Sequence, residues 1–114
     1  METFQMTQNS TVEISVHISS DASVGSYVSM SNNFKKRSTQ YNFTLLLGKS
    51  EELRNQVVSE VSNFFTDSNI INTIINNTSV LCIINDGTTK KQYTGTKEKM
   101  TNRIFVHYLD VKLI

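Results

Sequence analysis

Two histidines and one cysteine are the side chains in this chain of 114 residues that most readily do chemistry near neutral pH. His17 falls on the polar side of an alternating segment, and His107 lies in a mixed apolar segment. Neither has a histidine, cysteine or carboxylate neighbour at the spacing of a zinc site. Cys82 lies inside the apolar run 80–84, where we expect a small buried side chain. The pattern predicts no catalytic residue and no metal site, and hence no enzyme.

The sequence Gly48-Lys49-Ser50 resembles the end of a phosphate-binding P-loop. That loop needs a further glycine, separated from Gly-Lys by four residues, so that its backbone N–H groups can wrap a phosphate. Here Phe43 and Thr44 belong to an alternating strand pattern instead. We therefore expect Gly48 to supply a turn and Ser50 to cap a helix, with no nucleotide or other cofactor.

Basic residues gather in two places, although the net charge is only +1 and the pI about 7.9. With so little net charge, no overall field draws the protein to nucleic acid. A basic surface must then be local, and the two sets are Lys35-Lys36-Arg37 and the looser group Lys90, Lys91, Lys97 and Lys99. They indicate either a nucleic-acid surface or simply solvated charges that discourage aggregation of sheet edges.

The start of the sequence has neither the basic segment nor the apolar segment of a secretory signal. No apolar stretch approaches the roughly 20 residues that span a bilayer. Together with a single unpaired cysteine, this predicts a protein of the cytoplasm or the nucleus. The length predicts a single domain over residues 1–114, with residues 1–10 as a flexible N-terminus.

Three segments in the first half have the period of a β-strand. Residues 11–18 alternate between apolar and polar side chains, and residues 24–30 follow as a second strand in which Gly25 indicates a bulge. We expect these two strands to pair as an antiparallel meander. Residues 35–37 then fall in a polar connection, and residues 41–48 form a third strand.

After residue 50 the apolar period changes to that of a helix. Leucine, valine and phenylalanine recur along one stripe, which predicts a long amphipathic helix over residues 50–65. A shorter helix is predicted at 70–75 and a strand at 80–84, and Asn85-Asp86-Gly87 predicts a turn into a hairpin partner at 91–94. Residues 96–114 fit both a helix and a strand, and we favour the helix.

These elements predict an α+β fold, in which an antiparallel sheet of about five to six strands has one long and one or two shorter helices on one face. The helices leave the other face of the sheet free. It meets either water or a partner. We expect the exposed side chains of the first two strands to form a partner or dimer face, namely Glu13, Ser15, His17 and Tyr27.

The block Leu45-Leu46-Leu47-Gly48, the predicted helix ending in Val61, Phe64 and Phe65, and the strand 80–84 occur in an order that resembles the small proteasome assembly chaperones of the third and fourth type. The resemblance implies an antiparallel sheet with helices on one side, and a dimer with a related chaperone subunit. It also implies binding to an α-type subunit of the 20S proteasome during α-ring assembly, without nucleotide or metal.

The sequence thus predicts a non-catalytic, protein-binding subunit, and by resemblance a proteasome assembly chaperone. Whether the dimer joins identical or related chains stays open. One alternative is an adaptor or scaffold domain of another complex. Another is a small nucleic-acid-binding domain that uses the two basic sets.

Overall fold

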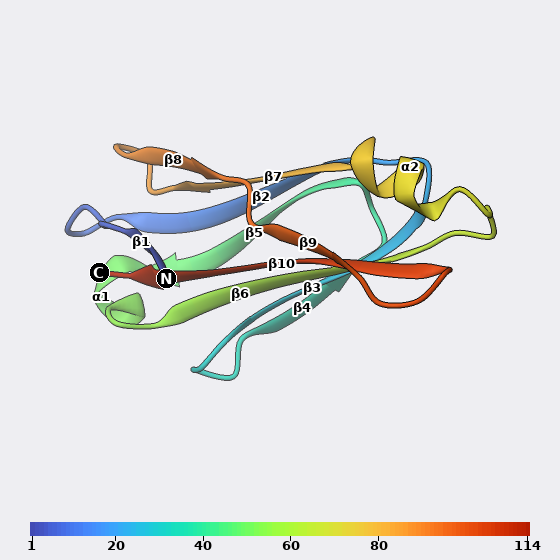
Figure 1. Cartoon of the computed structure of the whole chain (residues 1–114). Helices are drawn as coiled ribbons and strands as arrows, with labels where there is room; N and C mark the ends of the chain where they lie inside the picture. The colour runs from blue at the N-terminus through green and yellow to red at the C-terminus, as the bar shows by residue number, and fades with distance from the viewer.

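In the computed structural model, which describes residues 1–114, two β-sheets lie face to face (Figure 1). The six-stranded sheet contains β1 (Glu2–Phe4), β3 (Ser23–Met30), β4 (Lys35–Ser38), β6 (Val57–Phe65), β9 (Thr96–Lys99) and β10 (Ile104–Leu113). The four-stranded sheet contains β2 (Thr11–Ser19), β5 (Asn42–Lys49), β7 (Ser79–Asn85) and β8 (Lys90–Tyr93). The helices are α1 (Ser50–Leu53) and α2 (Ile71–Asn76), and neither is long and apolar enough to cross a membrane.

The predicted α+β fold with a long helix is wrong, because the protein is mainly β. The predicted helix over 50–65 ends after the four residues of α1, and most of the rest forms β6. Asn55 adopts a left-handed backbone with φ 67°, which interrupts the helix. From Val57 onward, valines and phenylalanines favour an extended strand packed in a sheet.

The helix favoured for the C-terminal segment is also wrong. Residues Ile104–Leu113 form β10, which pairs antiparallel with β6 from Ile104 to Lys112. The other edge of β10 pairs with β9 at one end and with β1 at the other. Every second side chain of β10, beginning at Phe105, is buried between the sheets.

The predicted meander of the first two strands is wrong as well, because β2 and β3 belong to different sheets. β2 lies between β5 and β7, whereas β3 lies between β6 and β4. Alternation shows which side of a strand is buried, but two strands facing one core from opposite sheets share the same pattern. Nor is there a bulge at Gly25, since the β3–β6 register is continuous there.

Other elements agree with the sequence. The alternating strands appear as β2, β3 and β5, the apolar run as β7, and the short second helix as α2. The turn Asn85-Asp86-Gly87 does lead into the hairpin strand β8. Gly87 has φ +87°, a conformation that glycine adopts without strain.

One hydrophobic core of 24 buried residues fills the space between the sheets, and both sheets, the two short helices and connecting segments contribute to it. Phe64 of β6 and Phe105 of β10 stack with ring centroids 4.6 Å apart. Cys82 is buried as predicted, and burial, followed by the nearby charge of Glu60, raises the pKa of its thiol. The cysteine therefore stays a protonated, apolar core side chain.

The first ten residues, for which we expect flexibility, include strand β1. It pairs in parallel with the end of β10, and Phe4 is buried in the core. The Met6 N–H donates to the carbonyl of Ile114 at 2.8 Å. The two ends of the chain therefore meet at the edge of the six-stranded sheet.

Asp86 ties this N-terminal segment to the β7–β8 hairpin. Its buried carboxylate accepts backbone N–H groups from Thr7 at 2.6 Å, Thr88 at 3.0 Å and Thr89 at 2.6 Å. Asp86→Ala leaves these donors without their acceptor, so we expect the free energy of unfolding to fall by about 2 kcal/mol. Urea denaturation measures this loss. The control is Asp21→Ala, which removes an exposed carboxylate and should change little.

Acid should remove the same contribution. Burial alone would raise the pKa of Asp86, but the three N–H donors outweigh it and hold the pKa below the usual value. The stabilisation is then complete above the unfolded pKa of about 3.9, and it is lost as pH falls through the lower folded pKa. The difference in free energy of unfolding between the wild type and Asp86→Ala should therefore become smaller in that acidic range. A difference that grows there would contradict this account.

Candidate functional site

A chain of buried polar side chains runs across the inner face of the six-stranded sheet. His107 Nδ1 lies 2.5 Å from Glu60 Oε1, and His107 Nε2 lies 2.5 Å from the carbonyl oxygen of Thr94. The Ser62 hydroxyl donates to Glu60 Oε2 at 2.6 Å. The Ser26 and Ser62 hydroxyls are 2.7 Å apart. These groups connect β3, β6 and β10 with the segment that precedes β9.

The hydrogen bonds indicate the charge of His107. Both ring nitrogens face acceptors, so both carry a proton and the ring is an imidazolium. Burial lowers the pKa of His107, but the hydrogen bond and charge of Glu60 and the Thr94 carbonyl together raise it above the usual value. Lys97 lowers it slightly. Glu60 and His107 therefore form an ion pair, with both side chains 1% exposed.

This cluster does not have the geometry of a nucleophile and its base. In a serine–histidine–carboxylate triad the histidine contacts the serine hydroxyl. Here Ser62 donates to Glu60, and both histidine nitrogens are occupied by other acceptors. The hydroxyl is also buried, as are Glu60 and His107. We therefore interpret the cluster as a structural element of the core.

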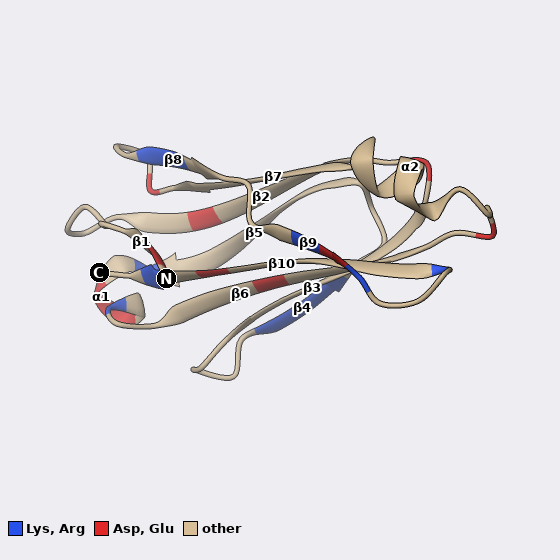
Figure 2. Cartoon of the chain, viewed as in Figure 1, with Lys and Arg blue, Asp and Glu red and all other residues tan.

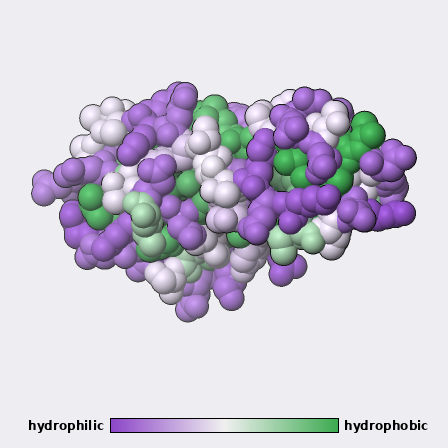
Figure 3. Space-filling model, viewed as in Figure 1, coloured by the Kyte–Doolittle hydropathy of each residue, from purple (hydrophilic) through white to green (hydrophobic).

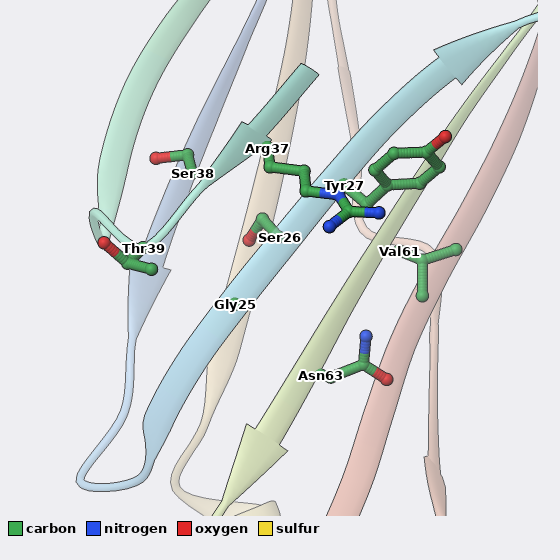
Figure 4. Close-up of a pocket in the computed structure, with 8 residues that line it drawn as sticks. All are labelled: Gly25, Ser26, Tyr27, Arg37, Ser38, Thr39, Val61 and Asn63. Carbon is green, nitrogen blue, oxygen red and sulfur yellow. The ribbon is translucent and has the colours of Figure 1, made fainter. Parts of the chain in front are cut away.

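A surface hollow of about 650 Å³ lies on the outer face of the six-stranded sheet, the face turned away from the four-stranded sheet. Tyr27, Arg37, Val61 and Asn63 frame it, and Gly25 lies at its floor (Figure 4). Ser26, Ser38 and Thr39 complete the lining. We call it the Arg37 hollow. Neighbouring positions of β4, β3 and β6 build it.

Gly25 creates the space. A Cβ atom built on Gly25 would meet nothing within 4 Å, and the residue does not have a positive φ. Neither the backbone nor a close neighbour therefore requires glycine at this position. Glycine inside a strand is less stable than alanine by about 0.5–1 kcal/mol. The visible effect of this residue is an open floor beside Arg37.

Arg37 faces Tyr27 across the β3–β4 ladder. Its guanidinium lies 5.5 Å from the centroid of the Tyr27 ring, close enough for a cation–π interaction. Neither of the protein's ion pairs involves Arg37. Across β3, Tyr27 is paired with Val61 of β6, which in turn is paired with Tyr108 of β10. The hollow thus combines a planar cation, an aromatic ring and the amide of Asn63.

The structure separates the residues predicted to form a partner face. Glu13, Ser15 and His17 lie together on the outer face of the four-stranded sheet, whereas Tyr27 lies on the outer face of the other sheet. Ser15 hydrogen-bonds Thr44 at 2.8 Å, so part of the β2 face is already paired within the sheet. Only Tyr27 belongs to the hollow.

Arg37 and Asn63 were not expected to share a site with Tyr27. Residues 35–37 were predicted as a connection, but they belong to strand β4. Asn63 was assigned to the long helix, but it lies in β6. The signal that could have identified Arg37 was the basic run that ends in Ser38. If this run forms an edge strand, Arg37 lies opposite a residue of β3.

The two basic sets do not form one surface. Figure 2 shows the blue segments of β4 and β8 on opposite sides of the molecule, and these strands belong to different sheets. Lys97 is engaged in the fold, because its Nζ donates to the carbonyls of Ile75 at 2.9 Å and Thr78 at 2.6 Å. Lys91 Nζ donates to the Thr3 carbonyl at 3.2 Å.

The predicted cap of the helix at Ser50 is wrong. Lys49 occupies the N-cap position of α1, with no side-chain hydrogen bond. Ser50 lies inside the short helix and is buried, and its hydroxyl accepts the Ser10 N–H at 3.2 Å. Its role is to hold the segment before β2 against α1.

Apolar atoms also gather at the end of the molecule that carries α2 (Figure 3). Ile70 is 55% exposed there, and Met100 in the β9–β10 connection is 58% exposed. Both contribute apolar surface beside charged and polar residues.

Comparison of the chain with known protein families, with curated proteins and with solved structures gave no match. The arrangement of its own residues must therefore support any functional conclusion. No group of three or more histidine, cysteine, aspartate or glutamate side chains is placed to hold a metal ion.

Proposed function

We propose that this chain is a non-catalytic protein-binding domain whose binding site is the Arg37 hollow. The observation that carries the proposal is the combination of an open floor at Gly25 with an Arg37 guanidinium that has no anionic partner. Aromatic residues and arginine are the side chains most enriched at protein interfaces. An arginine held against a tyrosine ring loses less conformational freedom when it binds a partner.

The structure changes the basis of the proteasome-chaperone hypothesis. The resemblance depended on a long helix after Leu-Leu-Gly, and those residues form β6 instead. What we retain is protein binding in the cytoplasm or nucleus. Dimerisation with a related subunit and binding to an α-type proteasome subunit stay predictions, which identification of the captured partner tests.

Matched valine substitutions on the two outer faces test the proposed site. Gly25→Val fills the floor of the Arg37 hollow, and Ser15→Val places the same side chain on the outer face of the other sheet. The tagged wild type and both variants are used to capture partners from cells, and recovered proteins are measured by mass spectrometry. We expect Gly25→Val to reduce recovery of the main partner about tenfold, as loss of a well-packed contact does.

The stability of the two variants separates binding from folding. Because Gly25 needs no glycine conformation, we expect Gly25→Val to melt at or above the wild-type temperature. Equal recovery with all three proteins would contradict the site. Loss of partner recovery with Ser15→Val alone would instead place the binding site on the face that carries Glu13 and His17.

A further inference from the structure

Strand β4 has a free edge beside the Arg37 hollow. It pairs only with β3, and Figure 1 shows it as the outermost strand of its sheet. No backbone hydrogen bond outside that ladder involves Lys35, Lys36 or Arg37. In an antiparallel edge strand, alternate residues direct their N–H and C=O groups outward. These groups are available to a further strand.

The charges of this edge are also uncompensated. The ion pairs of the protein are Arg103 with Asp67 and His107 with Glu60, so none of the three basic residues of β4 has a carboxylate partner. Lys35 and Arg37 are two residues apart in a strand and therefore share its outer side. A strand added at this edge would therefore meet two cations on one face, spaced like the alternate side chains of a β-strand.

A second copy of this chain does not fit the edge. Two β4 strands would place six basic side chains together, and such repulsion is how proteins keep edge strands apart. The edge strands of the other sheet, β5 and β8, contain no aspartate or glutamate. At the opposite edge of the six-stranded sheet, β1 and β9 contain one glutamate each, and the glutamate of β9 lies between two lysines. No edge strand of this chain therefore offers carboxylates at alternate positions, and a segment that does must come from another protein.

We infer that β4 takes up an extended, acidic segment of a partner protein as an added strand. The inference rests on the proposed function and names the chemistry of its partner. Main-chain hydrogen bonds to the β4 edge supply affinity, and side chains at alternate positions supply specificity. One carboxylate of the partner segment pairs with the Arg37 guanidinium above the hollow. A second carboxylate, two residues further along the segment, pairs with Lys35.

A peptide titration tests the inference directly. The probe is an end-blocked peptide, Thr-Glu-Val-Glu-Val-Glu-Thr, and its control has lysine in place of each glutamate. Binding and amide hydrogen exchange are followed by NMR on the full chain. We expect the acidic peptide alone to bind, and to slow exchange of the outward β4 amides at least about tenfold.

Two arginine variants identify the contact. Arg37→Gln should weaken binding of the acidic peptide about tenfold, because it removes a charge-assisted hydrogen bond. Arg54→Gln removes an exposed arginine after α1 and should leave binding unchanged. Each variant loses one positive charge, so a general electrostatic effect would weaken peptide binding equally in both and would overturn the inference.

Other results would also overturn it. Equal binding of the lysine peptide would show that binding does not depend on the charge of the peptide. Binding of oligothymidylate in place of the acidic peptide would indicate that the basic edge binds nucleic acid. If the acidic peptide fails to bind while Gly25→Val still loses the captured partner, strand addition is wrong and the proposed protein-binding site stands. If both tests fail, the proposed function is wrong too.

Discussion

Glu60→Leu should lower the free energy of unfolding by about 3–5 kcal/mol, because the buried His107 ring loses the carboxylate that pairs with its charge. In the wild type His107 lies 2.5 Å from Glu60 and cannot turn to water, since its other nitrogen is held by Thr94. The substitution also removes the acceptor of the Ser62 hydroxyl. Urea denaturation at neutral pH measures the loss.

The pH dependence of this loss has a defined sign. In the wild type the folded pKa of His107 is raised, so its stabilisation is complete below the unfolded pKa of about 6.5 and disappears as pH rises through the folded value. Without Glu60, burial lowers the folded pKa of His107, and the variant should lose stability as pH falls below about 6.5. The gap between the two proteins should therefore be widest in mild acid.

The double variant Glu60→Leu with His107→Leu is the control. A buried ion pair replaced by apolar side chains is often as stable as the original, whereas removal of one partner is strongly destabilising. We therefore expect the double variant to be more stable than either single variant. If the single variants unfold with a free energy within about 1 kcal/mol of the wild-type value, the ion pair does not contribute strongly to the stability of the core.

Gly95→Ala should lower the free energy of unfolding by about 3 kcal/mol, from backbone strain and a steric clash together. Gly95 has φ +63°, a region that alanine adopts only with strain. A Cβ atom there would lie 2.6 Å from His107 Nε2 and 2.7 Å from the carbonyl oxygen of Tyr108. Since Thr94 is the acceptor next to it, the clash also displaces a hydrogen bond of His107. Thermal or urea unfolding measures the effect.

Gly87→Ala separates the two contributions. Gly87 also has a positive φ, at +87°, but an added Cβ would meet nothing within 4 Å. Its alanine variant should show the backbone strain alone, about 1–2 kcal/mol. The excess loss in Gly95→Ala then reports the contact with His107. If the two variants are equally destabilised, the contact between the added Cβ atom and His107 does not affect stability.

The buried ion pair also explains why parts of the fold could not be predicted from the sequence. Alternation predicted β2, where Val12, Ile14 and Val16 are all buried. In β6 the corresponding inward positions include Glu60 and Ser62, so the period of two is broken by polar residues. The remaining valines and phenylalanines then fit a helical stripe. In β10 the interruption is His107, which separates Phe105 from Leu109 in the inward series.

The candidate site was predictable only in part. Tyr27 was identified as exposed, but its neighbours come from strand pairing, which alternation does not reveal. Arg37 lies beside Tyr27 because β4 pairs with β3 in one register, and Asn63 lies near them because β6 pairs with the other edge of β3. These are non-local contacts, and no short-range pattern in the sequence encodes them.

The parallel pairing of β1 with the end of β10 determines how the protein responds to a pull on its two ends. Residues Glu2 and Val111 begin the paired segment, and Phe4 and Leu113 end it, with both strands running in the same direction. A force applied at the two ends therefore acts along these strands in opposite senses. It loads the connecting hydrogen bonds together in shear, so that they resist collectively and do not open one at a time.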